Sequence, residues 1–241
     1  MIKAVFFDIG NTLVNFHSEA ISEQRKKILL EFLLQEGQNM TAQQIEKLIA
    51  EANDYVEKNY FGSVAKYSFG IGGLFFLFQK LRLEVDKKTF DTLEERVWDV
   101  CLHGAKLERH AKEILSSLKS NGYKLAVVSN WTTQRANQTI DAFDLRRFFD
   151  LIVISEDVGA EKSSTIPFKV ALEELGLKPE EVVMVGDRDD EDIFGAKMLG
   201  METVKINRSS QVFGETRKAD YEIDDLIELK EILKLDKHKT N

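Results

Sequence analysis

The sequence predicts an α/β fold: a Rossmann-like three-layer core with a parallel sheet, plus an inserted all-helical cap domain. Short apolar runs that end at polar residues recur along the chain, as is typical of strands buried on both faces. Helix-like segments lie between these runs, and this alternation indicates right-handed crossovers and a parallel sheet. One long N-terminal stretch has helical spacing throughout, so we expect it to form a domain of its own.

The first expected strand is the apolar run Ala4–Phe7, which ends abruptly at Asp8. Helical spacing begins at Ser18, and Thr41 with Gln44 three residues later matches a capping box at the start of a second helix. Helices of this block are expected at 18–37, 41–56, 74–83 and 87–101. We therefore place the helical cap domain at 16–103 and the core domain at 1–15 and 104–241.

The remainder of the chain alternates between strands and helices, and Gly122, Gly176 and Gly200 stand where helices are expected to end. Strands are expected at 125–128, 151–154, 182–185, 203–206 and 221–223. Helices are expected at 107–121, 133–143, 168–175, 192–199 and 226–233.

Composition narrows the class of protein. The 241 residues carry a net charge of -8 and no long basic run, which argues against nucleic acid or an anionic membrane as the main partner. The apolar stretch 71–78 is far shorter than the ~20 residues that span a bilayer. Cys101 is the only cysteine, which favours a reducing compartment. We expect a cytoplasmic monomer or homodimer.

Polar residues follow the expected strands at the places where their carboxyl ends should meet. Taken singly, each has an ordinary explanation: a turn residue, a solvated loop lysine, or acids at a helix N-terminus. Because ligands of open α/β sheets bind at the carboxyl ends of the strands, we expect these residues to converge on one site. The set comprises Asp8 with Thr12, Ser129 with Asn130, Lys162, and Asp187 with Asp192.

The chemistry of this set fits phosphoryl transfer. A carboxylate such as that of Asp8 can attack phosphorus and form an aspartyl-phosphate. Asp8 and Asp187 offer the hard oxygen ligands that Mg²⁺ prefers, and Lys162 adds a fixed positive charge. Hydroxyl and amide donors of Thr12, Ser129 and Asn130 would bind the oxygens of a small phosphorylated substrate.

With these motifs the sequence resembles the haloacid dehalogenase (HAD)-like hydrolase superfamily, in the subclass with a helical cap after the first strand. The resemblance covers residues 1–15 and 104–236 and rests on DIGNT, VVSN, Glu161-Lys162 and VGDRDDEDIFGAKMLGM. It implies that Asp8 is the nucleophile, and that the Gly10 carbonyl and the Asp187 carboxylate are metal ligands. The resemblance also implies that Asp192 supports the metal or its waters, but Glu191 stands at the other spacing that the family uses, so both acids stay open.

The sequence departs from the family pattern at two positions. Phosphatases of the family usually have an acid/base aspartate where this chain has Gly10, so we expect low activity or a restriction to good leaving groups such as anomeric or acyl phosphates. His17 is a possible substitute for this side chain. After Lys162, two serines replace the usual proline.

Three functions stay open at this point, with a Mg²⁺-dependent phosphatase favoured. Another hydrolase of the same family is the first alternative, either a 2-haloacid dehalogenase or a phosphonatase. Dehalogenases lack the Gly186-Asp187 pair, and a phosphonatase needs a cap lysine, for which Lys47, Lys58 and Lys66 qualify by composition only. A non-catalytic member that binds a phosphorylated ligand or a protein is the second alternative. The aromatic, glycine-rich segment 59–78 is a candidate wall of the substrate pocket.

Overall fold

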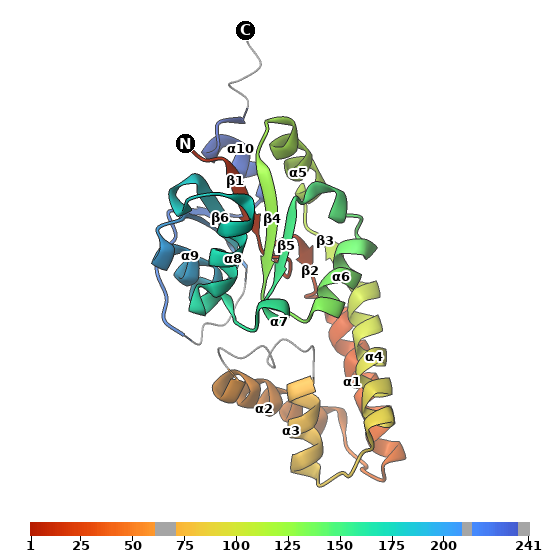
Figure 1. The fold of residues 1–241 in the computed structure, drawn as a ribbon. Coiled ribbons are helices and arrows are strands. Elements are labelled where there is room, and N and C mark those ends of the chain that lie inside the picture. The colour runs from red at the N-terminus through yellow and green to blue at the C-terminus, as the bar shows by residue number, and fades with distance from the viewer. Residues whose placement is uncertain (61–70, 209–213, 236–241) are drawn as a thin grey trace. The chain divides into compact units, whose positions relative to one another are not determined.

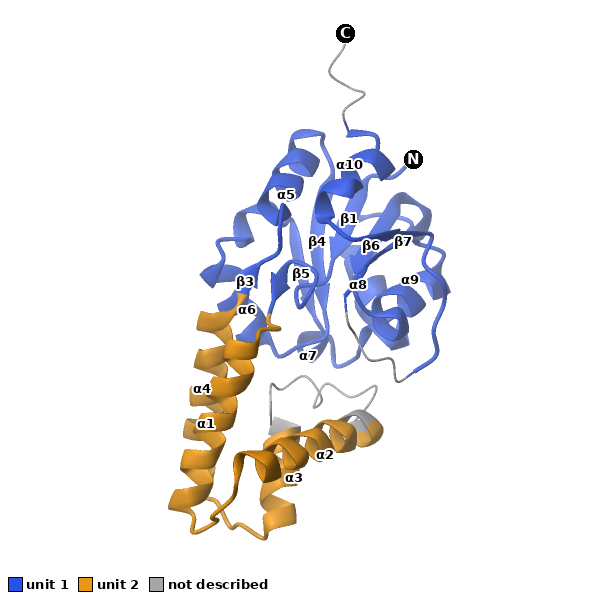
Figure 2. Ribbon diagram, turned by 180° about the vertical axis from the view of Figure 1, so that it is seen from behind, with its two compact units in different colours: residues 1–15, 106–241 blue, residues 16–105 orange. Residues whose placement is uncertain are grey.

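A computed structural model describes residues 1–60, 71–208 and 214–235. The chain forms two compact units: Met1–Asn15 with Lys106–Asn241 (unit 1), and Phe16–Ala105 (unit 2) (Figure 2). Lys66 and half of the aromatic segment 59–78 lie outside the described residues. In the described ranges, no helix has both the length and the apolar character needed to cross a bilayer.

Unit 1 is built on a parallel sheet whose strands, in the part of the chain that the structure describes, run in the order β5-β4-β1-β6-β7-β8 (Figure 1). The predicted Rossmann-like fold is therefore confirmed. The strands are β1 (Ala4–Phe7), β4 (Lys124–Ser129), β5 (Leu151–Ile154), β6 (Val182–Gly186), β7 (Glu202–Ile206) and β8 (Tyr221–Ile223). In the centre, Phe7 pairs with Val127 on one side and with Val185 on the other, so these three strands end within two residues of one another.

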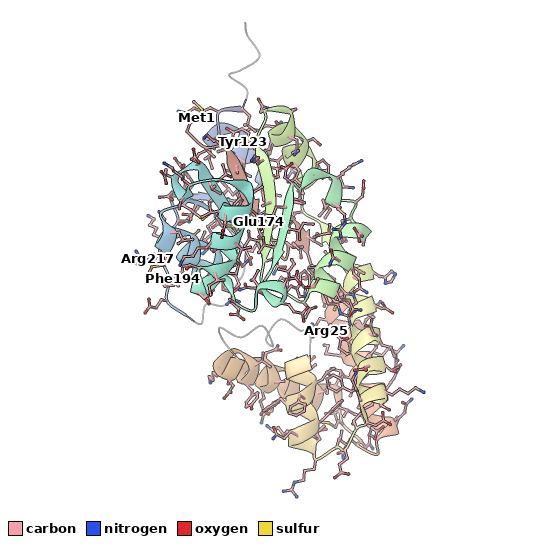
Figure 3. The ribbon with its side chains drawn as sticks, viewed as in Figure 1. Met1, Arg25, Tyr123, Glu174, Phe194 and Arg217 are labelled. Carbon is pink, nitrogen blue, oxygen red and sulfur yellow. The ribbon has the colours of Figure 1, made fainter. Side chains whose placement is uncertain are left out.

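Helices cover both faces of this sheet (Figures 1 and 2). They are α5 (Ala111–Ser120), α6 (Thr133–Ala142), α7 (Ser155–Val158), α8 (Ile166–Leu175), α9 (Phe194–Leu199) and α10 (Leu229–Ile232). Strand side chains alternate between faces, and Phe6, Ala126 and Met184 pack with Phe168 of α8 in one buried cluster. Over α9, the Arg217 guanidinium lies 5.9 Å from the centre of the Phe194 ring (Figure 3).

Unit 2 consists of four helices in the described residues: α1 (Glu19–Gln35), α2 (Ala42–Tyr60), α3 (Ile71–Leu81) and α4 (Lys87–Gly104). The predicted capping box is present, because Thr41 N donates to Gln44 Oε1 at 2.8 Å and Gln44 N donates to Thr41 Oγ1 at 3.2 Å. The apolar faces of the helices meet in a core of their own, in which the Phe32 and Phe78 rings lie 5.4 Å apart.

Three expected elements differ from the structure. Leu107 begins no helix; it pairs with Val14, so that β3 (Lys106–Leu107) and β2 (Val14–Asn15) form an antiparallel ladder. The helix expected at 192–199 is a π-turn, Asp189–Ile193, followed by α9. The last expected helix is divided into a 3₁₀ turn, Leu226–Glu228, and α10. Pairing between distant segments and the choice of hydrogen-bond register decide these cases, and neither follows from local periodicity.

Two glycines allow loops to approach one another closely beside the sheet edge. A Cβ at Gly186 would lie 2.2 Å from the Asp192 Cγ atom, and a Cβ at Gly195 would lie 2.1 Å from the Lys162 carbonyl oxygen. Any side chain at either position would force the Asp192 turn or the Lys162 turn to move. The glycines therefore set how closely these segments pack.

We predict that Leu115→Ala, in the buried face of α5, lowers the free energy of unfolding by about 2–5 kcal/mol. The lost side chain is fully buried, so both its transfer energy and a cavity contribute. Met198→Ala on α9 is the control, because that side chain is 50% exposed and its loss should cost no more than about 0.5 kcal/mol. Urea unfolding followed by circular dichroism measures both, and equal losses would contradict the described core.

We also predict that Gly195→Ala lowers stability by about 1–3 kcal/mol, because the new methyl group meets the Lys162 backbone and that backbone must shift. Gly10→Ala is the matched control: no atom lies within 4 Å of the added Cβ and φ lies outside the left-handed range. It should be neutral or slightly stabilising. Thermal unfolding of both variants checks this pair. A greater loss for the Gly10 variant would mean that the packing at these two positions is wrongly described.

Candidate active site

The neighbouring carboxyl ends of β1, β4 and β6 bring together residues that are far apart in the sequence. Asp8 directly follows β1, and its backbone N–H donates to the Val185 carbonyl at 3.0 Å, which extends the ladder by one residue. Ser129 is the last residue of β4, and Asp187 directly follows β6. The Ser129 hydroxyl donates to Asp8 Oδ1 at 2.9 Å, and the Asp8 side chain is nearly buried.

Lys162 brings a cation into this edge of the sheet. It opens a short 3₁₀ turn, Lys162–Ser164, and is only 1% exposed. Its ammonium lies 2.7 Å from Asp8 Oδ1 and 2.5 Å from Asp192 Oδ1. Burial alone would lower the lysine pKa, but the carboxylates of Asp192, Asp8 and Glu191 outweigh burial and raise it. The amine therefore stays protonated at neutral pH.

The carboxylates of Asp8, Asp187 and Asp192 form a buried cluster, with one oxygen of each lying within 4.8 Å of the others. Three carboxylates against the one ammonium of Lys162 leave two excess negative charges if all are ionised. Burial, together with Asp8 and Asp187, raises the pKa of Asp192 despite the ion pair with Lys162. Hard oxygen ligands with surplus negative charge are what a divalent cation such as Mg²⁺ requires, so the residues fit such an ion.

The structure separates the two acids that the sequence left open. In the π-turn, Ile193 N donates to Arg188 O at 3.2 Å, an i to i+5 bond that accommodates one more residue than an α-turn. Asp192 consequently faces the cluster, where its Oδ2 accepts from the Arg188 backbone N–H at 3.0 Å. The Glu191 carboxylate instead lies between Asn130 and Arg188.

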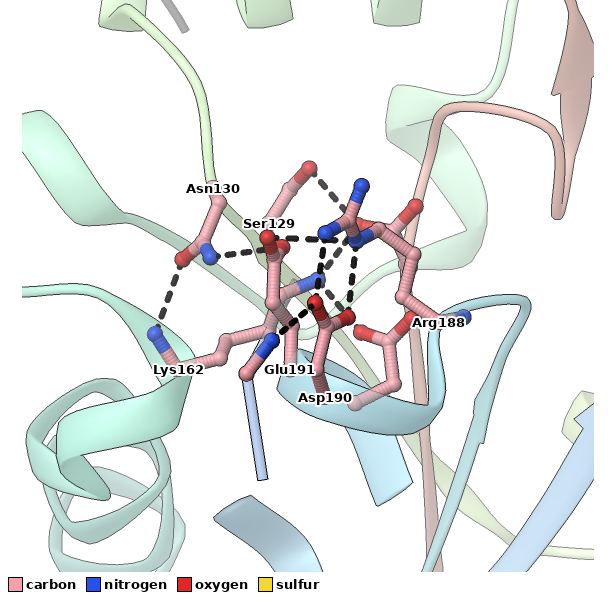
Figure 4. Close-up of polar contacts among 9 residues, drawn as sticks. Ser129, Asn130, Lys162, Arg188, Asp190 and Glu191 are labelled. Atoms are coloured by element: carbon pink, nitrogen blue, oxygen red, sulfur yellow. Dashed lines mark hydrogen bonds and ion pairs between the residues drawn. The ribbon is translucent and has the colours of Figure 1, made fainter. Parts of the chain in front are cut away.

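Arg188 and Asp190 are residues for which the sequence predicted no role. The guanidinium of Arg188 contacts both oxygens of Asp190, at 3.0 and 2.8 Å, and its Nε lies 3.2 Å from Glu191 Oε1 (Figure 4). Asp190 is fully buried. The run DRDDED therefore does not form a uniformly solvated helix start; its acids point to different partners, which charge patterning alone could not reveal.

The remaining predicted residues have distinct surroundings. Thr12 is fully buried, and its hydroxyl has no hydrogen-bond partner among the described residues, as expected for a group that binds a ligand or water. A Cβ at Gly10 would meet no atom within 4 Å, so there is open space where the acid/base side chain of related enzymes is expected. His17 is exposed and belongs to unit 2. Asn130 is buried, with its carboxamide bonded to protein groups.

Comparison with known proteins agrees with this architecture. A family model described as "Haloacid dehalogenase-like hydrolase" matches residues 5–206. The chain is 31% identical to "Glyceraldehyde 3-phosphate phosphatase" of Methanothermobacter thermautotrophicus, over 97% of this chain and 100% of that protein. It is 28% identical to "Ribulose-1,5-bisphosphate 5-phosphatase" of Halopiger xanaduensis, over 97% and 100%.

Among solved structures, the HAD phosphatase from Thermococcus onnurineus superimposes with a TM-score of 0.72 at 27% identity, covering 96% of this chain and 98% of that one. The family model spans most of both halves of the core, including all strand ends that carry the polar cluster. The chain is thus a hydrolase that belongs to the haloacid dehalogenase-like family.

Proposed function

We propose that this chain is a Mg²⁺-dependent phosphatase that hydrolyses a small phosphorylated metabolite through an aspartyl-phosphate at Asp8. One observation carries the proposal: the Asp8 carboxylate is held by Lys162 and Ser129 at 2.7 and 2.9 Å, inside a cluster with Asp187 and Asp192. The two relatives compared above both bear phosphatase names, which supports the same class of reaction.

The metal would be held by the carboxylates of Asp8 and Asp187 and by the backbone carbonyl of Gly10, with Asp192 as a further ligand or as a partner of bound water. When bound, Mg²⁺ supplies positive charge to the phosphoryl oxygens as charge develops on them. The surplus negative charge of the cluster is the feature that requires such an ion.

Asp8 then acts as the nucleophile. Lys162 and Ser129 both contact Oδ1, so Oδ2 would be the oxygen that attacks. A bond forms between this oxygen and phosphorus while the bond from phosphorus to the leaving oxygen breaks. Water subsequently attacks phosphorus, which releases inorganic phosphate and regenerates the Asp8 carboxylate. Lys162 and the Thr12 hydroxyl would stabilise the phosphoryl group, and the Ser129 hydroxyl would join them by moving its hydrogen bond from Asp8 to a phosphoryl oxygen.

Among the described residues, the site offers no good proton donor for the leaving oxygen. Gly10 has no side chain to protonate the leaving oxygen, and Lys162 is a poor acid because nearby carboxylates raise its pKa. A positioned acid or base contributes about 10²–10⁴-fold to rate, so we expect good leaving groups such as acyl or anomeric phosphates to react best.

Unit 2 is proposed to act as a cap domain that selects the substrate, with limits close to the 16–103 expected from the sequence. We also propose a cytoplasmic location. The single cysteine, Cys101, is buried and forms no disulfide, which suits a reducing compartment. Dehalogenation needs no metal, and the acidic cluster around Asp187 argues against it. A purely binding role is disfavoured, because Asp8, Lys162 and Asp187 are all retained and clustered.

The proposal predicts phosphate release from p-nitrophenyl phosphate with Mg²⁺ and none with chelator. Asp8→Asn should lower kcat by at least about 10³-fold, because the amide cannot form the aspartyl-phosphate. Glu173→Gln removes one exposed carboxylate from α8 and should leave the rate unchanged. Wild-type protein that releases no phosphate from any ester, or halide release from 2-haloacids without metal, would overturn the proposal.

Gly10→Asp should raise the turnover of an alkyl phosphate such as glycerol phosphate by on the order of 10²-fold, because the open space accepts a side chain that can protonate the leaving oxygen. The gain should be much smaller for p-nitrophenyl phosphate, whose leaving group departs without a proton. Gly10→Asn is the control of equal size without an acid. Equal turnover of the two variants would mean that proton transfer does not limit the reaction.

A further inference from the structure

Asn130 was expected to bind the phosphoryl group, yet its side chain is engaged elsewhere. It is 6% exposed and directly follows β4. Its Oδ1 accepts from the backbone N–H of Lys162 at 2.9 Å, and its Nδ2 donates to Glu191 Oε2 at 2.9 Å (Figure 4). Both ends of the carboxamide therefore bind protein groups.

The chemistry of the two partners fixes the orientation of this carboxamide. A backbone N–H only donates and an ionised carboxylate only accepts, so an amide turned by 180° would oppose two donors at Lys162 and two acceptors at Glu191. Asparagine is the side chain of this size that satisfies both partners at once. The position consequently demands one acceptor and one donor at defined places.

Each hydrogen-bond partner of Asn130 belongs to a turn that carries a group of the site. Lys162 contacts Asp8, and Glu191 is adjacent in sequence to Asp192. Lys162 carries the ammonium that bridges Asp8 and Asp192, and the Asn130 bond fixes the backbone from which its long, flexible side chain extends. The carbonyl of the same residue lies close to Gly195, where any side chain would displace it. Glu191 precedes Asp192 in the π-turn and also meets Arg188 Nε at 3.2 Å.

We propose that Asn130 is a positioning residue and not a substrate ligand: its carboxamide joins the Lys162 turn to the Glu191–Asp192 turn and thereby sets where the ammonium and the second carboxylate meet Asp8. This inference rests on the proposed phosphatase function for its effect on rate. The connection between the two turns through the Asn130 carboxamide, called the joint below, rests only on the two hydrogen bonds.

A pair of substitutions tests the joint. Asn130→Asp keeps an acceptor for the Lys162 N–H but places a carboxylate oxygen against Glu191. Adding Glu191→Gln replaces that repulsion with a hydrogen bond of reversed polarity, and the pair regains its original net charge. Asn53→Asp, the same chemical change at an exposed position of α2, is the control and should leave activity unchanged.

We expect Asn130→Asp to lower kcat by on the order of 10²-fold, the cost of a displacement of about 1 Å in a catalytic group, with KM nearly unchanged. The double variant should recover most of that loss. If Asn130 binds the phosphoryl group instead, the new carboxylate repels substrate whatever stands at position 191, KM rises and the double variant does not recover. That result, or wild-type kcat in Asn130→Asp, would overturn the inference.

Two further measurements keep the test decisive. If Asn130→Asp does not fold, the comparison is between Glu191→Gln and the double variant: higher kcat in the double variant supports the joint, and equal or lower kcat refutes it. If wild-type protein shows no phosphatase activity, the proposed function has failed by itself. The coupling between the two substitutions in urea unfolding then decides, because favourable coupling supports the joint and additive effects contradict it.

Discussion

The ammonium of Lys162, buried between Asp8 and Asp192, is the interaction on which the site depends. Removing three charged groups from water costs several kcal/mol for each ion, and their mutual attraction offsets this only when the geometry is good and the remaining polar atoms are bonded. The structure meets that demand with a hydroxyl from Ser129 and a backbone N–H from Arg188, one for each carboxylate. A buried charge arrangement of this kind therefore adds little net stability.

The sheet explains how the polar groups of the site meet, because most of them lie at or next to strand ends. β1 lies in the middle of the sheet, and its neighbours β4 and β6 end within two residues of it, so the strand ends themselves place Asp8, Ser129 and Asp187. Lys162 and Asp192, by contrast, come from turns. Those two turns are the ones joined by a buried carboxamide and held close by glycines.

The sequence was sufficient for the six strands of the parallel sheet, for most helices and for the convergence of Asp8, Ser129, Lys162 and Asp187, because strand ends in a parallel sheet share one edge. It was insufficient where hydrogen-bond register decides. The choice between Glu191 and Asp192 depends on an i to i+5 bond that no side-chain pattern encodes.

Arg188 and Asp190 are only two positions apart, and the conformation of their turn decides that they pair, whereas the pairing of Leu107 with Val14 joins distant segments. Each of these features joins residues whose relation appears only after the chain has folded. Local propensity therefore predicts the framework of the core better than it predicts the second layer of contacts around the site.

The short ladder of β2 and β3 has an architectural consequence. Asn15 and Lys106 are partners in an antiparallel pair, so the chain leaves the core and returns to it at adjacent points, about 5 Å apart. A tight turn of a few residues spans that gap and would convert the ladder into an ordinary hairpin. The 90 residues between them, Phe16–Ala105, are thus an insertion at a single point of the core, and those that the structure describes contribute no strand to its six-stranded sheet.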